Sequence, residues 1–152
     1  MEYDVRRFNG TFKGLIAECM FKLTNERCVL TRFFNRNKYA KIFEKYYSQD
    51  QINFLMNNWY SIDALEIKFV EKKTQFLLYE IKAKNAYAGK WPHKMTSSTV
   101  EMYKNAIALG FESKLVTVWF HDNWKFDVQI EDIEKANWTI DRPKLYDQKR
   151  EL

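Results

Sequence analysis

The sequence predicts an α/β protein in which helices flank a mixed β-sheet, and the hydrophobic pattern carries that prediction. Residues 11–24 and the stretch from Ser98 to Gly110 repeat apolar side chains at helical spacing. Residues 59–70, 75–84 and 114–120 have the composition of mostly buried strands. Because helices and strands follow one another along the chain, helices packed on one sheet are the economical arrangement. We expect the 152 residues to form a single domain with a sizeable core.

The N-terminal part supplies one helix, one strand and a less regular insert. Residues 11–24 predict the first helix, which ends at Thr24-Asn25. Residues 27–34 have the β-branched and aromatic content of a strand. Residues 37–57 contain two short apolar helical faces, made first by Tyr39, Ile42, Phe43 and Tyr46 and then by Ile52, Leu55 and Met56.

The strongest pair of predicted strands follows this insert. Residues 59–70 and 75–84 are separated by Glu71-Lys72-Lys73-Thr74, a short polar connection that predicts an antiparallel hairpin. Residues 85–96, which include Gly89 and Pro92, predict a loop.

The C-terminal part predicts a second helix and two more strands. Ser98 and Glu101 fit a capping box at the start of the helix, and Gly110 is well placed to end it. The segments after it predict, in order, a buried strand at 114–120, a turn at 121–123, an edge strand at 124–130, a short helix at 131–137 and a frayed tail after Pro143.

Composition excludes several classes of protein. A chain that is 46% hydrophobic and 17% aromatic is not expected to be disordered. No apolar run approaches the length needed to cross a bilayer, and the N-terminus lacks the apolar stretch of a secretory signal. Cys19 and Cys28 have no metal-ligand or redox spacing, so we expect reduced thiols in a cytoplasmic protein without a membrane partner.

Positive charge is concentrated in the middle of the chain. The net charge is +5, and acids outnumber bases after residue 121. Residues 32–47 carry five bases against Glu44 alone, and residues 82–94 carry four lysines and no acid. This distribution suits a polyanionic partner such as a nucleic acid. The candidate nucleic-acid contacts are Arg36, Lys38, Lys41, Lys84, Lys90 and Lys94.

The basic run has a second interpretation. Tyr39, Phe43, Tyr46 and Tyr47 are interleaved with its cations, so this segment could be a helix buried between the subunits of a homodimer. Both interpretations can hold at once. On the second interpretation we expect a homodimer or a higher assembly.

Charged residues interrupt the two strands of the predicted hairpin. Alternation puts Glu80 and Lys82 on the same side of their strand, about 6–7 Å apart. Asp63 is expected near the middle of the preceding strand and a few positions out of register with Glu80, so that a twist or bulge would bring the carboxylates together. A hard divalent cation would relieve the repulsion between them, and the backbone carbonyl of Ile81 could supply another ligand.

Asp63 followed by Glu80-Ile81-Lys82 resembles the signature of the PD-(D/E)XK nuclease superfamily, which has the restriction-endonuclease-like fold. That family, which includes archaeal Holliday-junction resolvases, has a core of helix, three strands, helix and strand. Its members usually carry a further glutamate on the first helix, where this chain has Glu18 after Gly14. The proline of the family name is replaced by Ile62.

The resemblance implies a metal-dependent endonuclease that hydrolyses DNA phosphodiester bonds. Glu18, Asp63 and Glu80 would bind magnesium, which manganese could replace, and Lys82 would be the catalytic lysine. A Holliday-junction resolvase, a nuclease specific for one duplex sequence and an enzyme acting on flaps or ends are all compatible with these residues. RNA as the substrate stays open as well.

Each of these residues also has a simpler interpretation. Asp63 could accept a hydrogen bond from a backbone amide, and Glu80 and Lys82 could form an ion pair on a solvated face of the sheet. Glu18 could be an ordinary charge on an amphipathic helix. A nucleic-acid-binding module without catalysis, or a structural interaction protein, would then be the alternative function.

Overall fold

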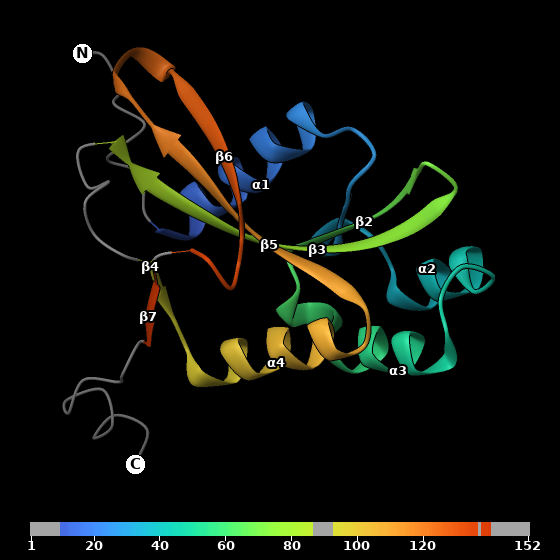
Figure 1. Ribbon diagram of the computed structural model, residues 1–152. Helices are drawn as coiled ribbons and strands as arrows, with labels where there is room; N and C mark the ends of the chain where they lie inside the picture. The colour runs from blue at the N-terminus through green and yellow to red at the C-terminus, as the bar shows by residue number, and fades with distance from the viewer. Residues whose placement is uncertain (1–9, 87–92, 137, 141–152) are drawn as a thin grey trace.

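The computed structural model is a five-stranded mixed sheet with helices on both faces, so the predicted fold class is confirmed (Figure 1). It describes residues 10–86, 93–136 and 138–140. The helices are α1 (Gly10–Thr24), α2 (Arg36–Phe43), α3 (Gln49–Asn58) and α4 (Ser97–Ala108), with 3₁₀ turns η2 (Thr31–Phe33), η3 (Trp59–Ser61) and η5 (Asp122–Trp124). The strands are β1 (Val29–Leu30), β2 (Ala64–Val70), β3 (Lys73–Asn85), β4 (His93–Met95), β5 (Phe111–Phe120), β6 (Phe126–Asp132) and β7 (Trp138–Ile140).

The order of elements is the one that the sequence predicts for the core. Helix, three strands, helix and strand are represented by α1, β1, β2, β3, α4 and β5, with α2 and α3 inserted between β1 and β2. The sheet order is β1-β2-β3-β5-β6, and β4 pairs separately with β7. β2 runs antiparallel to β3, whereas β5 runs parallel to it, because α4 carries the chain back to the other end of the sheet.

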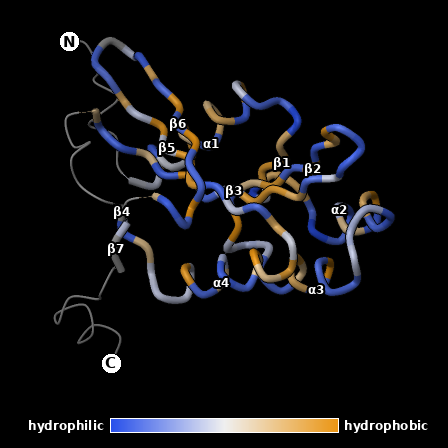
Figure 2. The backbone as a smooth tube through the Cα atoms, viewed as in Figure 1, coloured by the Kyte–Doolittle hydropathy of each residue, from blue (hydrophilic) through white to orange (hydrophobic). Residues whose placement is uncertain are grey.

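The sheet divides the hydrophobic core into two parts. On one face α1 packs Ala17 and Phe21 against Leu77, Tyr79 and the even-numbered apolar residues of β5. On the other face α2, α3 and α4 bury a larger cluster around Leu65, Leu78 and Leu115. The helices alternate between hydrophobic and hydrophilic residues in Figure 2, as expected for helices that bury one side. β3 lies between both clusters, so its side chains define the two faces.

The insert at residues 37–57 forms two helices, as its apolar faces predict. Asn35 caps α2 by accepting the N–H groups of Asn37 and Lys38, each at 3.0 Å. Ser48 and Gln51 form a capping box at the start of α3. Tyr39 is buried, and its hydroxyl bonds to that of Tyr47 at 2.6 Å. The aromatic residues of this run therefore largely pack inside one chain.

The strand predicted at residues 27–34 is much shorter than expected. Only Val29 and Leu30 pair with β2, and the chain then turns into η2. The turn is stable because Thr31 donates its N–H to the carbonyl of Asp63 at 3.1 Å and its hydroxyl to the carbonyl of Ile62. The indole N–H of Trp59 donates to the carbonyl of Thr31 at 3.2 Å. These bonds replace the ladder that a longer strand would make.

Three predictions for the second half are wrong in detail. Thr96, not Ser98, caps α4, because its extended backbone lets its hydroxyl accept the N–H of Thr99 at 3.2 Å. Of the helix predicted at 131–137, the described residues 131–136 instead end β6 and turn, since Asp132 pairs with Lys114 and its carbonyl accepts the N–H of Lys135 at 3.0 Å. The predicted loop at 85–96 begins with the end of β3 and contains β4.

Several other sequence predictions can be placed on this fold. Gly110 follows α4 with a φ of +93°, which favours glycine, and β6 is an edge strand of the sheet. Gly89, Lys90, Pro92 and the tail after Pro143 lie outside the described residues. Cys19 and Cys28 are free thiols. In the part of the chain that the structure describes, no helix is long and apolar enough to cross a membrane.

The hairpin between β2 and β3 is closed by Glu71 and Lys72, both at positive φ, 49° and 68°. A Cβ atom costs roughly 1–2 kcal/mol per residue in this region, and Asn-Gly suits a two-residue turn of this kind. We expect the double substitution Glu71→Asn/Lys72→Gly to raise the free energy of unfolding by about 1 kcal/mol in urea denaturation.

The matched control is Lys73→Gly, one residue into β3, which should lower the free energy of unfolding by about 0.5–1 kcal/mol. A loss of stability in the double variant would contradict the turn geometry.

Candidate active site

The register of the hairpin brings Asp63 directly opposite Glu80. Ala64 pairs with Tyr79, so the residue before β2 faces the residue after Tyr79. The sequence predicts an offset of a few positions, because its polar connection, Glu71-Lys72-Lys73-Thr74, has four residues. The actual turn has two residues, and this removes the offset without a twist or bulge. The prediction that Asp63 lies near the middle of a strand is wrong. Asp63 lies immediately before β2.

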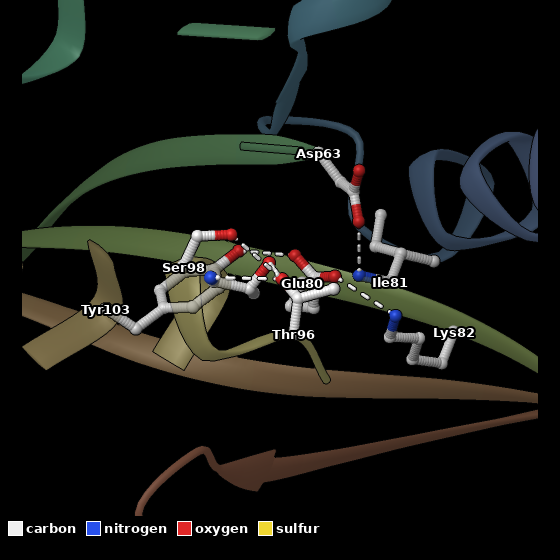
Figure 3. Close-up of polar contacts among 8 residues, drawn as sticks. Asp63, Glu80, Ile81, Lys82, Thr96, Ser98 and Tyr103 are labelled. Carbon is white, nitrogen blue, oxygen red and sulfur yellow. Dashed lines mark hydrogen bonds and ion pairs between the residues drawn. The ribbon is translucent and has the colours of Figure 1, made fainter. Parts of the chain in front are cut away.

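Glu80 is buried, and each of its carboxylate oxygens has a partner. Its Oε1 lies 3.3 Å from the Nζ of Lys82, two residues along the same face of β3. Its Oε2 accepts a hydrogen bond of 2.7 Å from the hydroxyl of Tyr103 on α4. Figure 3 shows Glu80 between these two groups. Because Glu80 is only 8% exposed, the ion pair does not lie on a solvated face of the sheet.

Asp63 is held by the backbone of β3. Its Oδ2 accepts the N–H of Ile81 at 2.7 Å (Figure 3). The simpler interpretation, in which Asp63 accepts a hydrogen bond from a backbone amide, is thus correct as far as this contact goes. Since the N–H and C=O of one strand residue point to the same neighbouring strand, the Ile81 carbonyl lies on the Asp63 side of β3. The carboxylate oxygens of Asp63 and the carbonyl oxygen of Ile81 therefore lie on the same side of β3, at one edge.

This edge is open along the second half of β3. Pairing with β2 begins at Ala64 and Tyr79, whereas β3 continues to Asn85 in register with β5. Among the described strands, none pairs with residues 81–85 on the Asp63 side. Asp63, Glu80 and Lys82 thus stand where two neighbouring strands part.

Glu18 approaches from α1, on the other face of the sheet. It is 5% exposed, and its Oε2 accepts a hydrogen bond of 2.8 Å from the Nε of Arg32 in η2. Burial raises the pKa of Glu18, the Arg32 guanidinium opposes that rise, and the charge of Glu80 adds to it. Glu18 is therefore near enough to the Asp63–Glu80 pair to interact with it, although Arg32 occupies one of its oxygens.

Burial is also the main reason that the pKa of Asp63 rises to about 7, and the charge of Glu80 is the second. The hydrogen bond from the Ile81 N–H opposes the rise, and Glu18 adds to it. Three acidic side chains on three elements thus repel one another in a poorly solvated place. Such an arrangement lowers stability and is a common property of functional sites.

The donor set suits a hard divalent cation. Magnesium prefers a few carboxylates together with waters and phosphate oxygens, and Asp63, Glu80 and the Ile81 carbonyl supply oxygen ligands only. Within the described residues no group of three or more His, Cys, Asp or Glu side chains is assembled at metal-ligand spacing.

The predicted DNA contacts do not form one surface. Arg36, Lys38 and Lys41 are exposed on α2, whereas Lys94 is exposed on β4, and Figure 1 shows these elements on opposite sides of the molecule. Lys84 lies on β3 on the same face as Glu80 and Lys82, with its Nζ 5.9 Å from the centre of the Trp119 ring. Burial lowers its pKa. Lys90 is outside the described residues.

Two residues of the site were missed by the sequence analysis. Tyr103 was assigned only to the apolar face of its helix, although a buried tyrosine hydroxyl requires a partner and was therefore a signal. Arg32 was counted in the basic run without a specific role. Nothing in its sequence neighbourhood indicates Glu18, because that contact depends on how η2 packs beside α1.

Comparisons with protein-family models, with curated proteins and with solved structures found no match to this chain.

The raised pKa of Asp63 gives a stability prediction. Folded Asp63 holds its proton more tightly than the unfolded chain does, so the free energy of unfolding falls as pH rises from about 4 to about 7. Asp63→Asn removes the charge and keeps an oxygen for the Ile81 N–H. We expect this variant to be more stable than the parent at pH 8 by about 2–4 kcal/mol, and equal to it near pH 4, in urea unfolding.

Asp132→Asn is a control with the opposite sign. A hydrogen bond from Lys114 lowers the pKa of Asp132, so this carboxylate stabilises the fold above its ordinary pKa. Its removal should lower stability at pH 8. A destabilised Asp63→Asn protein at pH 8 would show that Asp63 is favourably ionised in the fold.

Proposed function

We propose that this protein is a metal-dependent endonuclease that hydrolyses DNA phosphodiester bonds. The observation that carries the proposal is the carboxylate of Asp63 opposite the Glu80–Lys82 pair at the open edge of β3. This arrangement, and the order of elements around it, resemble the PD-(D/E)XK nucleases. The mutual repulsion of the acids supports the proposal, since a structural ion pair has no need of a third carboxylate nearby.

Bound magnesium, or manganese in its place, would neutralise the acidic site and polarise a phosphodiester for attack by water. Asp63 and Glu80 would hold the ion, with the Ile81 carbonyl as a further oxygen ligand. The Ile81 N–H orients Asp63, and Tyr103 orients Glu80, through hydrogen bonds of 2.7 Å each. These bonds fix the donor oxygens before the ion arrives.

Lys82 supplies positive charge on the substrate side of the site. Its side chain is 32% exposed and its Nζ is 3.3 Å from Glu80 Oε1, so the ammonium group can move between the carboxylate and an incoming phosphate. There it would stabilise the charge that develops on the phosphate oxygens or orient the attacking water. Glu18 would act as a further ligand when released by Arg32, or hold Arg32 for contact with phosphate.

The proposal also includes a homo-oligomer, DNA as the partner and a cytoplasmic location. A single domain with one site cuts one strand at a time, so we propose a homodimer or higher assembly for cleavage of two strands. The exposed basic side chains of α2 would contact the DNA backbone. The free thiols Cys19 and Cys28 fit a reducing, cytoplasmic environment.

Loss of catalysis tests the site. Glu80→Gln and Lys82→Met should each lower magnesium-dependent cleavage of DNA by at least about 100-fold, measured as the rate of product formation on a gel, while DNA binding in calcium stays intact. The same assay with RNA decides between the two nucleic acids.

Glu66→Gln is the matched control. Glu66 is also a buried carboxylate of this hairpin, but it lies on the opposite face and accepts hydrogen bonds from Asn25 and Tyr79. Cleavage by Glu66→Gln should match the parent. Full activity of the Glu80 and Lys82 variants would reject the site and favour a binding module without catalysis.

A second pair of variants tests the orientation of Glu80. Tyr103 and Tyr79 each donate a hydroxyl to a buried glutamate, at 2.7 and 2.8 Å, on opposite faces of the sheet. Both Tyr→Phe changes should lower the free energy of unfolding by about 1–3 kcal/mol. Only Tyr103→Phe should also weaken magnesium binding, by about 10- to 100-fold in isothermal titration calorimetry. Equal magnesium affinities in the two variants would remove Tyr103 from the site.

A further inference from the structure

Two aromatic side chains project into solvent from the turns that adjoin the candidate site. Tyr60 in η3 is 84% exposed and Phe33 in η2 is 64% exposed. Single exposed apolar residues are common on protein surfaces, but these two lie on elements that contact each other. Their common surroundings decide what they can bind.

The turns that carry these rings are firmly held. Trp59, next to Tyr60, is buried, and its indole N–H donates to the carbonyls of Thr31 and Phe34, both at 3.2 Å. Arg36 donates to the carbonyl of Met56 at 3.2 Å. The backbone segments that carry the exposed rings are thus fixed, and little backbone ordering would be needed when a ligand binds.

The same turns are joined to the acidic site. Thr31 donates its N–H to the carbonyl of Asp63 at 3.1 Å, and Arg32 binds Glu18 at 2.8 Å. Tyr60 is three residues before Asp63, a span of at most about 10 Å of extended chain. Arg32 also borders an open pocket of about 530 Å³ against the first turns of α1, where Phe12 and Leu15 are the apolar lining. The backbone positions that carry these rings therefore lie close to the acidic site.

Charge around the rings favours a nucleic acid over a protein partner. Residues 31–43 contain Arg32, Arg36, Lys38 and Lys41 and no acid, and all four cations are exposed. The guanidinium of Arg36 lies 5.7 Å from the centre of the Tyr60 ring. Aromatic and arginine side chains occur in both kinds of interface, but lysines such as Lys38 and Lys41 are depleted from protein interfaces, whereas aromatic rings interleaved with basic residues suit bases and phosphates.

We propose that Tyr60, with Arg36 beside it and Phe33 on the adjoining turn, forms a surface on which an unpaired base of a DNA strand stacks. Bases inside a continuous duplex have both faces covered by their neighbours, so stacking on a ring there first costs the free energy of unstacking, which a base that is already unpaired does not require. The inference rests on the proposed function and narrows its substrate. The nuclease would prefer DNA with unpaired nucleotides next to the bond that is cut, such as a flap, a gap or a branched structure, over continuous duplex.

Binding without cleavage tests the stacking surface. The probes are a duplex, the same duplex with a single-stranded flap and the flap strand alone, each measured by fluorescence anisotropy in calcium. Tyr60→Ala should weaken binding of the flap probe and of the single strand by about 5- to 100-fold and change duplex binding by less than about twofold. Tyr60→Phe keeps the ring and should bind like the parent.

Phe69→Ala is the matched control for the loss of an exposed aromatic ring. Phe69 is 62% exposed but lies near the hairpin turn, at the other end of β2 from Asp63. This variant should bind all three probes like the parent. A 2-aminopurine placed in the flap should be quenched by the parent and by Tyr60→Phe, and not by Tyr60→Ala.

The outcomes separate the stacking surface from the nuclease activity. Equal losses on all probes, or unchanged binding by Tyr60→Ala, would overturn the stacking surface even if the protein cleaves DNA in magnesium. Selective loss together with quenching, in a protein that cleaves no probe, would uphold the surface and reject the nuclease. Absence of DNA binding by the parent, or capture of a protein partner through Tyr60, would overturn it as well.

Discussion

The two-residue turn at Glu71 and Lys72 sets the relation on which the site depends. It fixes the register in which Ala64 pairs with Tyr79, and this register carries Asp63 to the position opposite Glu80. A slip of one residue would turn Asp63 away from that face and bury Glu66 on the wrong side. The register is specified from both faces, because Leu65 and Leu78 belong to one core cluster while Ala64 and Leu77 belong to the other. The packing of the whole domain thus secures the relative position of two carboxylates.

The same β-hairpin contains two buried carboxylates in contrasting environments. Glu66 accepts hydrogen bonds from Asn25 and Tyr79, and no second acid is needed to explain its place in the fold. Glu80 lies beside Asp63, whose pKa is raised to about 7, and within electrostatic reach of Glu18. A fold selected for stability alone has no reason to gather acids that oppose one another's ionisation. The acids around Glu80 therefore lower the stability of the fold, whereas Glu66 on the opposite face does not have this cost.

Local patterns account for much of this structure, and long-range contacts account for the rest. The period of apolar residues predicted α1, both helices of the insert and the central strands, since each has enough apolar positions to define its type. The pairing of Asp63 with Glu80 was predicted as a pair but not in register, because the length of the turn depends on backbone angles that Glu and Lys rarely adopt. The early end of β1 depends on Thr31, Asp63 and Trp59, which are distant in sequence. Arg32 and Tyr103 entered the site only through tertiary packing.

The insert between β1 and β2 connects the core to the proposed substrate surface. Two of the aromatic residues that suggested a subunit interface, Tyr39 and Tyr47, are buried within the chain, where their hydroxyls bond to each other at 2.6 Å. The residues left outside are of a different kind, with Tyr60 and Phe33 exposed among cations. The aromatic residues buried in the core are not available to any partner, whereas the exposed ones are. The division of aromatic residues between the interior and the surface thus leaves Tyr60 and Phe33 as rings that the proposed DNA strand would meet.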